Sequence, residues 1–279
     1  MSYLKRRTHL TDIFGVEKPI IGMVHLLPLP GSGFYDGNLE PVLERAIQDA
    51  KALEEGGVDA IEVENFGDMT YFPGEVGPET VAAMTYIASE LSREVNIPMG
   101  ICVLTDPYSA FAIAHAVRAS FIRATVYTEA IVDVSGVIQG PAHRIQRLRK
   151  LLSDDTVRIF ADVQIKHSVP LAPRPIEESV KDAFYFLADA VIVSGRFTGE
   201  ETPIEKVKRV KEYLPEFPIL VGSGANPKNI RSLLRYADGA IVGTAFKRDR
   251  ITTNPVDVKN VKEFMEIVKS IRRELRTRE

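Results

Sequence analysis

The chain has 279 residues, of which 45% are hydrophobic and 26% are charged, and its formal net charge is −3. These values are typical of a globular protein with a large core, and the slightly acidic balance offers no electrostatic basis for binding nucleic acid. A single cysteine, Cys102, excludes an intrachain disulfide, and no cluster of Cys and His indicates structural zinc. No apolar run approaches the roughly 18 residues of a membrane span, so we expect a cytoplasmic protein without membrane insertion.

One pattern occurs eight times along the chain: a short apolar run, a turn rich in polar residues, Gly or Pro, and an amphipathic stretch of helical period. Continuous apolar runs are typical of parallel strands that are buried on both faces. The predicted strands span residues 19–26, 59–65, 98–105, 121–126, 158–166, 190–194, 218–222 and 239–244. The predicted helices span residues 41–55, 78–94, 108–118, 142–152, 176–187, 203–213, 227–235 and 256–276.

Eight such units in a chain of this length predict an α/β protein with the (β/α)8 TIM-barrel fold, which typically needs about 250 residues. We expect a single domain over residues 1–279, in which residues 1–18 form an N-terminal lead-in and residues 19–276 form the barrel. A doubly wound open sheet is the alternative. It suits the chain less well, because eight units without a break in composition favour closure of the sheet.

The active site of such a barrel lies at the carboxyl ends of its strands. Three of the loops that leave this end are long, at residues 66–77, 127–140 and 167–175. Long loops without structure of their own are uncommon in a compact domain and are usually functional. We therefore expect them to form lids or to contact a substrate, and surface elaboration without a role is the alternative.

Two glycine-containing turns predict a phosphate site. They follow the seventh and eighth strands, where barrels of this kind commonly bind phosphate on backbone amides and helix N-termini. The candidate residues are Gly222, Ser223 and Gly224 in the first turn, and Gly243, Thr244 and Lys247 in the second. The alternative is that these glycines only permit tight turns.

Polar and charged residues interrupt three of the apolar strands with a period of two, which places them on the face that points to the barrel axis. They are Glu62 and Glu64 in the second strand, Arg123 and Thr125 in the fourth, and Asp162, Gln164 and Lys166 in the fifth. Such groups are not buried unpaired. They either form a structural ion network or act on a ligand at the mouth, and Glu62, Glu64 or Asp162 are possible ligands for Mg²⁺ or Mn²⁺.

Histidines stand at the ends of two strands. His25 closes the first strand and His167 follows Lys166, so each is placed to act as a general acid or base. Cys102 lies within an apolar strand and is expected in the core. The predicted catalytic residues are therefore Lys166, Glu64, Asp162 and His25.

Several motifs carry a resemblance to a known family. They are HLLPLPGS (25–32), VENFGD (63–68), ADVQIKH (161–167), VSGRFTG (193–199), VGSGAN (221–226), DGAIVGTAFK (238–247) and NPVD (254–257). In this order they resemble the BtpA family, which is named for a protein needed for stable photosystem I. The resemblance extends from about Ile20 to Val268 and implies a barrel of the ribulose-phosphate-binding type. The motifs also contain Asn65, Asp68 and Gly195, which we add to the expected substrate contacts.

These features favour an enzyme that acts on a small phosphorylated metabolite, either a sugar phosphate or a nucleotide-derived compound. An inward lysine beside carboxylates suits an aldolase, isomerase or epimerase, which works through a Schiff base or by proton abstraction. A non-catalytic assembly or stability factor, as in photosystem I biogenesis, and a metal-dependent hydrolase are the alternatives. We expect copies of the chain to associate through their outer helices into a homo-oligomer.

Overall fold

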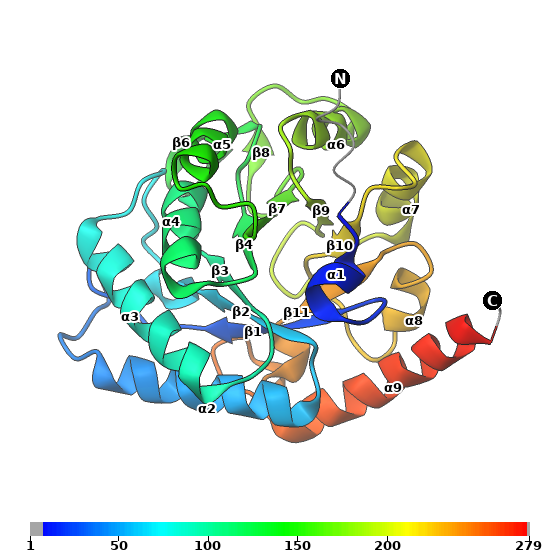
Figure 1. Cartoon of the computed structure of the whole chain (residues 1–279), viewed down its shortest axis with the longest axis horizontal. Coiled ribbons are helices and arrows are strands. Elements are labelled where there is room, and N and C mark those ends of the chain that lie inside the picture. Colours follow the sequence, from blue (N-terminus) through cyan, green and yellow to red (C-terminus); the bar gives the residue numbers. More distant parts are fainter. Residues whose placement is uncertain (1–7, 278–279) are drawn as a thin grey trace.

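The computed structural model describes residues 8–277 and confirms the predicted (β/α)8 barrel (Figure 1). Its barrel strands are parallel neighbours in the closed order β1 (Ile20–His25), β2 (Ala60–Glu64), β3 (Met99–Cys102), β4 (Phe121–Ala124), β7 (Arg158–Asp162), β9 (Ala190–Val193), β10 (Ile219–Val221) and β11 (Gly239–Val242). The surrounding helices are α2 (Glu40–Gly56), α3 (Pro78–Glu94), α4 (Pro107–Val117), α5 (Ala142–Leu151), α6 (Ile176–Tyr185), α7 (Ile204–Tyr213), α8 (Ile230–Leu233) and α9 (Val258–Arg276).

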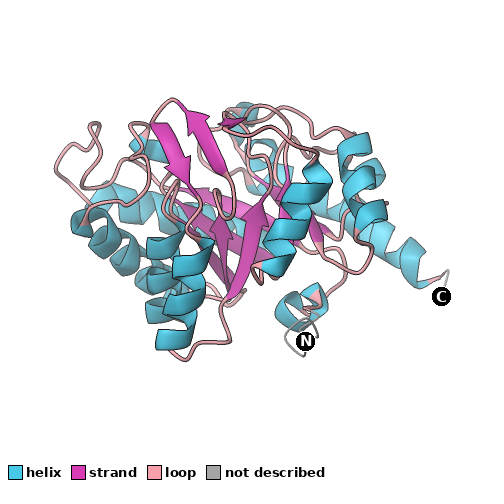
Figure 2. Cartoon of the chain, turned by 90° about the horizontal axis from the view of Figure 1, so that it is seen from above, coloured by secondary structure: helices cyan, strands magenta, loops and turns pink. Residues whose placement is uncertain are grey.

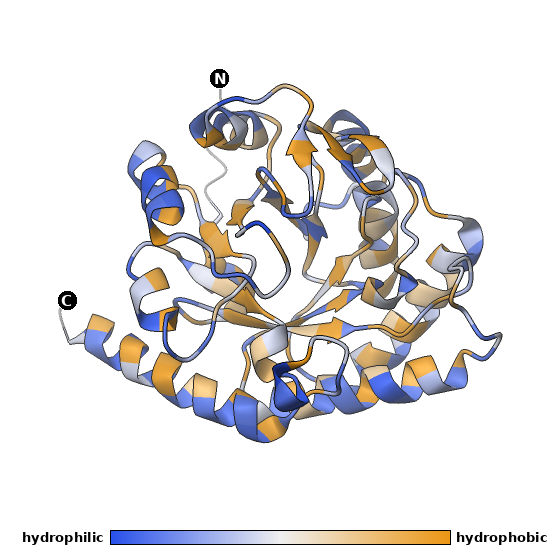
Figure 3. Ribbon diagram, turned by 180° about the vertical axis from the view of Figure 1, so that it is seen from behind, coloured by the Kyte–Doolittle hydropathy of each residue, from blue (hydrophilic) through white to orange (hydrophobic). Residues whose placement is uncertain are grey.

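Closure of the barrel follows from the apolar strands. β1 pairs with β2 on one side and with β11 on the other, so none of the barrel strands has a free edge. The helices α2 and α9 lie side by side along the lower edge of Figure 1 and complete the ring. Apolar positions alternate with polar ones along both helices, as Figure 3 shows, because one face packs on the sheet and the other meets solvent. No helix among residues 8–277 is long and apolar enough to cross a membrane.

The amino end of the barrel is sealed by the lead-in segment. Residues 1–7 of this segment lie outside the described residues, and the rest contains α1 (Leu10–Phe14). Phe14 makes ring contacts with Phe121 and Phe160, which point inward from β4 and β7. An apolar layer therefore fills this end of the barrel, and a pocket can form only at the carboxyl end.

The second of the long loops is ordered rather than structureless. It contains the antiparallel hairpin β5 (Ala130–Asp133) and β6 (Gly136–Gln139), and β8 (Val169–Pro170) from the next loop pairs with β5. Ile131 and Ile138 on one face of the hairpin are buried against Val126 and Ile165. The hairpin stands at the end of the barrel opposite α1 (Figure 2). It brings the predicted loops at residues 127–140 and 167–175 together over one side of the barrel mouth.

Among the predicted elements that are longer than the observed ones, two bear on the site. The fifth barrel strand ends at Asp162, because the backbone at Gln164 turns to a φ of 49°. The predicted helix over residues 227–235 shortens to α8, because the amide of Asn226 donates to the side chain of Asn229 and holds a separate turn before the helix. A helix of four residues has only a small dipole. The predicted contribution of a helix N-terminus to the phosphate site is therefore wrong, and the backbone amides of the turn are left as the candidate phosphate donors.

Candidate active site

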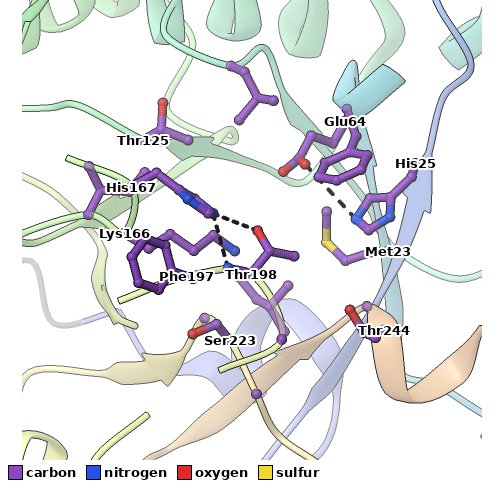
Figure 4. A pocket seen from close by; sticks show the side chains of 18 of the residues that line it. Met23, His25, Glu64, Thr125, Lys166, His167, Phe197, Thr198, Ser223 and Thr244 are labelled. Carbon is purple, nitrogen blue, oxygen red and sulfur yellow. Dashed lines mark hydrogen bonds and ion pairs between the residues drawn. The ribbon is translucent and has the colours of Figure 1, made fainter. Parts of the chain in front are cut away.

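A pocket of about 800 Å³ opens at the carboxyl ends of the strands (Figure 4). Met23, His25 and Glu64 line one side of it, Lys166 reaches in from another, and Ser223 and Thr244 lie along a third. The predicted catalytic and phosphate-binding regions therefore border the same cavity.

Glu64 and His25 form a close pair at the pocket wall. They are the last residues of neighbouring strands, and the His25 Nε2 atom lies 4.0 Å from the Glu64 carboxylate. The His25 Nδ1 atom lies 3.4 Å from the Thr252 carbonyl, and the ring stacks on Phe66. Burial, followed by the charge of Lys247, holds the pKa of His25 well below its ordinary value, so the imidazole is neutral at pH 7. A neutral imidazole beside a carboxylate is suited to carry a proton.

Lys166 is the amine of the pocket. Among residues 8–277, no group lies within hydrogen-bond or ion-pair distance of its ammonium. Burial and, after it, the positive charge of Arg123 lower the pKa of Lys166 from its ordinary value. A larger share of neutral amine at pH 7 makes Lys166 a better nucleophile or base. Gln164, expected on the same face, instead donates to the Arg174 carbonyl and does not line the pocket.

Arg123 organises a buried ion cluster beneath the pocket. Its guanidinium makes two hydrogen bonds to Asp162, at 2.7 Å and 3.1 Å, and lies 3.5 Å from Glu62 and 3.7 Å from Glu64. The inward faces predicted for these strands are therefore confirmed. The catalytic role expected for Asp162 is corrected, because Arg123 occupies both of its oxygens and Asp162 does not line the pocket. Asp162 positions Arg123, as the structural-network alternative anticipated.

The structure brings together two of the three possible ligands for Mg²⁺ or Mn²⁺, Glu62 and Glu64. The potential ligand atoms of Glu62, Glu64 and Cys102 lie within 4.8 Å of one another, while Asp162 is bonded to Arg123. Burial raises the pKa of the Cys102 thiol, and hard cations disfavour sulfur. The guanidinium of Arg123 lies beside both glutamates and already supplies positive charge there.

Glu62 is fully buried, and neither of its carboxyl oxygens has a hydrogen-bond partner among the described residues. Burial raises its pKa from an ordinary 4.5 to about 8, so the carboxyl is protonated in the folded protein at pH 7. In the unfolded chain the same group ionises. Its contribution to stability is therefore complete below about pH 4.5 and is lost as the pH rises through about 8.

We expect Glu62→Gln to remove this pH dependence, because the amide keeps the shape of the side chain and does not ionise. Urea unfolding of both proteins at about pH 5 and about pH 8.5 measures it: the wild type should lose several kcal/mol more than the variant over this interval. Parallel losses in the two proteins would show that Glu62 does not titrate in this way.

In the turn after β10, some polar groups are hydrogen-bonded within the described part of the protein and others have no partner there. Gly222 lines the pocket, but its amide donates to the Val193 carbonyl and is not free to donate to a phosphate. The Ser223 hydroxyl accepts from the Gly195 amide at 2.9 Å. Gly224 has a φ of 65°, and a Cβ there would overlap the Glu200 carbonyl, so only glycine fits. Among residues 8–277, the amides of Gly224 and Ala225 have no acceptor, and both residues line the pocket.

The turn after β11 lies beside the first. The amides of Thr244 and Ala245, in the first turn of a short 3-10 helix, likewise have no acceptor within the described chain. A Cβ at Gly243 would lie 3.2 Å from the His25 ring, so glycine lets this turn approach the histidine. The two turns together present unpaired amides of the kind that bind anions.

Lys247 does not belong to this anion-binding region. Its ammonium is buried and donates to Asp49 at 2.9 Å, which corrects its expected contact with phosphate. Two other cations, Lys228 and Arg250, line the mouth instead. Both are exposed residues that follow the glycine turns, and only their distance from those turns along the chain could have suggested them.

Three further expected substrate contacts serve the scaffold. Asn65 donates to Asp68 at 2.8 Å, and Asp68 accepts from the Leu29 amide, which fastens the loop after β2 to that after β1. The Gly195 amide is bonded to Ser223. Asn65, Asp68 and Gly195 do not line the large pocket, so their expected contacts are corrected.

His167 connects two loops at the pocket mouth. Its Nε2 atom accepts from the Thr198 amide at 3.0 Å and lies 2.9 Å from the Thr198 hydroxyl. Burial lowers the pKa of His167, which suits a neutral ring that accepts a hydrogen bond. The ring also contacts Phe197, as Figure 4 shows. His167 therefore holds the loop after β9 over the pocket, and its Nε2 atom is occupied rather than free for acid or base catalysis.

Comparison with solved structures supports the fold. The (S)-3-O-geranylgeranylglyceryl phosphate synthase of Thermoplasma acidophilum, solved with sn-glycerol-1-phosphate, has a TM-score of 0.59 at 17% identity and covers 97% of this chain and 99% of its own. A thiamine phosphate pyrophosphorylase from Pyrococcus furiosus has a TM-score of 0.57 at 18% identity and covers 94% and 99%. At these identities the likeness shows the barrel fold.

Comparison of sequences is more specific. The photosystem I biogenesis protein BtpA of Synechocystis is 42% identical over 259 residues, which are 92% of this chain and 90% of the relative. An uncharacterized protein of Methanocaldococcus jannaschii is also 42% identical over 258 residues, with 92% and 97% covered. A model of the BtpA family matches residues 16–270. Because this match and the motifs of the pocket extend through nearly the whole barrel, the chain belongs to the BtpA family.

Proposed function

We propose that the protein is an enzyme that acts on the carbonyl group of a small phosphorylated metabolite, with chemistry of the aldolase, isomerase or epimerase type. One observation carries this proposal. A single pocket has unpaired backbone amides after β10 and β11 along one side, and the unpartnered amine of Lys166 and the pair of Glu64 and His25 around the rest. The first group suits a phosphate and the second suits a reacting carbonyl.

The chemistry follows from these groups. The neutral amine of Lys166 attacks the carbonyl carbon, and loss of water gives an iminium ion. The iminium accepts the electron pair of a neighbouring bond, which is a C–H bond in an isomerase or epimerase and a C–C bond in an aldolase. Glu64 takes up the proton released, from the carbon or from the hydroxyl of the leaving fragment, and returns it in the second half of the reaction. Hydrolysis of the iminium restores the lysine.

The names of solved neighbours support a phosphorylated substrate. One of them holds sn-glycerol-1-phosphate, and others are a thiamine phosphate pyrophosphorylase and a phosphoribosyl anthranilate isomerase. Each is a barrel related to this chain in fold. The turns after β10 and β11 give this chain its own reason to bind phosphate, independent of that likeness.

A matched pair of variants tests the phosphate site. Thr244 lines the pocket beside the unpaired amides. Thr244→Asp places a negative charge there, and Thr244→Asn has the same shape without the charge. Because like charges at contact distance repel by several kcal/mol at a partly buried site, we expect Thr244→Asp to weaken binding of ribose 5-phosphate at least about tenfold relative to Thr244→Asn.

Isothermal titration calorimetry with inorganic phosphate and ribose 5-phosphate measures this difference. Equal affinities of the two variants would place the phosphate elsewhere on the protein. A wild-type protein that binds neither ligand would contradict the proposal itself.

A non-catalytic assembly or stability factor is the second candidate. The name of the Synechocystis relative, a photosystem I biogenesis protein, favours it. The two candidates differ in what they require of Lys166. An enzyme of the proposed type needs its amine, whereas an assembly factor would tolerate its replacement.

A further inference from the structure

The side of the pocket opposite the phosphate turns is largely apolar. In the closed order of the barrel, β3 and β4 lie across from β10 and β11. The apolar side chains that line the pocket around β3 and β4, including the hairpin, are Met69, Leu104, Val126, Ile131, Val134 and Ile165, beside the polar Tyr71, Thr105, Arg123, Thr125 and Asp133. The pocket is therefore built for a ligand with two chemically different ends.

Three of the polar side chains on this side are already paired within the protein. The Tyr71 hydroxyl donates to the Phe66 carbonyl at 2.6 Å, and the Thr105 hydroxyl donates to the Phe72 carbonyl. The Thr125 hydroxyl accepts from the Thr105 amide. What these residues leave for a ligand is mostly carbon, and a second phosphate or a bare sugar would find few partners there.

Three large apolar side chains at the mouth remain exposed. Val134 is 93% exposed, Phe197 59% and Met69 57%, and all three line the pocket. Exposed apolar surface around a concave site marks a place where a ligand is covered on binding. A ligand that reaches from the phosphate turns to these residues would bury them.

The size of the pocket agrees with a ligand larger than a sugar phosphate. If each non-hydrogen atom is given the roughly 30 Å³ that water occupies as an upper limit, a pentose phosphate of about 14 such atoms fills at most about 420 Å³. The pocket holds about 800 Å³. Roughly half of its volume is left for another group, on the apolar side.

Asp133 indicates what kind of group this is. It lines the pocket from the hairpin, one of its carboxylate oxygens accepts from the Ser135 amide, and the other has no donor among residues 8–277. A hydrocarbon chain offers nothing to a carboxylate, whereas a ring with an N–H group does. The exposed aromatic face of Phe197 is likewise suited to stack on a planar ring.

We infer that the substrate is a phosphorylated carbonyl compound whose other end is a planar, nitrogen-containing ring, as in a ring-bearing sugar phosphate. A nucleoside monophosphate has the same phosphate and ring without a free sugar carbonyl, so it serves as an unreactive probe of binding. The phosphate lies on the turns after β10 and β11, and the ring lies between Phe197, Leu104 and the hairpin. This inference rests on the proposed function, because it takes the phosphate end from it.

Calorimetry with four probes tests the inference: inorganic phosphate, ribose 5-phosphate, uridine 5′-monophosphate and octyl phosphate. Burial of a ring is expected to make uridine 5′-monophosphate bind at least about tenfold more tightly than ribose 5-phosphate. Phe197→Ala should weaken the binding of uridine 5′-monophosphate about fivefold or more and leave the affinity for ribose 5-phosphate unchanged. Phe186→Ala is the control, since Phe186 is also exposed and lies outside the pocket.

The outcomes separate the two proposals. If ribose 5-phosphate binds and uridine 5′-monophosphate binds no more tightly, the proposed binding of a ring is contradicted. The proposed phosphate site is still supported by that result. Tighter binding of octyl phosphate than of the nucleotide would replace the ring with a hydrocarbon chain. If no probe binds, the proposed function fails and the inference fails with it.

Discussion

Borohydride reduction in the presence of a phosphorylated aldehyde or ketone is expected to attach the carbon skeleton of the ligand to Lys166. The iminium formed between its amine and the carbonyl is reduced to a stable secondary amine, which mass spectrometry of the digested protein locates. Lys166→Met should abolish this label, because no other amine among the residues that line the pocket is buried beside Glu64. Dihydroxyacetone phosphate, glyceraldehyde 3-phosphate and ribose 5-phosphate are suitable probes.

Lys206 supplies the matched control. Burial lowers its pKa as well, but its ammonium donates to the Ser194 carbonyl at 3.1 Å, and it does not line the pocket. Lys206→Met should therefore keep the label. Since the pKa of Lys166 is lowered, its neutral amine persists to lower pH than that of an ordinary lysine, and labelling should extend to lower pH accordingly. Labelling spread evenly over surface lysines would contradict the role of Lys166. If a probe binds and no lysine is labelled, the role of Lys166 would be limited to proton transfer.

Arg123→Met is expected to cost about 3–5 kcal/mol of the free energy of unfolding. The guanidinium is buried and bonds both oxygens of Asp162, so its removal leaves that carboxylate without a cation in the barrel interior. The methionine fills much of the volume, so the loss reports the charge rather than a cavity. Urea unfolding monitored by circular dichroism measures it.

Two comparisons make this result specific. Arg209→Met breaks the exposed ion pair with Glu177 and should cost at most about 1 kcal/mol. Arg123→Met combined with Asp162→Asn should be more stable than Arg123→Met alone, because the unpaired carboxylate is gone. If Arg123→Met loses no more than Arg209→Met, the buried cluster does not depend on Arg123 as described.

The barrel was predictable because each of its units is a local pattern. Apolar runs identify strands whatever they pair with, and the period of two correctly places Glu62, Glu64, Arg123 and Asp162 on the inner face. The rule holds as far as Asp162, where the strand ends. Beyond that point Gln164 turns outward, and the position of Lys166 depends on the conformation of the turn rather than on strand alternation.

What the pattern does not contain is which charges meet. Asp162 is paired with Arg123, 39 residues away, and Lys247 with Asp49, 198 residues away. Such pairs depend on strand register and side-chain reach, which no local period encodes. Asp162 and Lys247 therefore had the right chemistry for a site but serve the scaffold. The hairpin at residues 130–139 did carry a signal, since Ser135 and Gly136 stand between two apolar runs, and the turn forms at Val134 and Ser135.

We propose that one pocket holds a phosphate on the turns after β10 and β11 while Lys166 reacts with the carbonyl of the same molecule. A crystal structure of the wild-type protein after borohydride reduction with the probe that labels it most tests this directly. The expected result is continuous density from Lys166 Nζ to the ligand, with its phosphate against the amides of Gly224, Ala225, Thr244 and Ala245. A phosphate bound away from these amides, or an adduct outside the pocket, would contradict it.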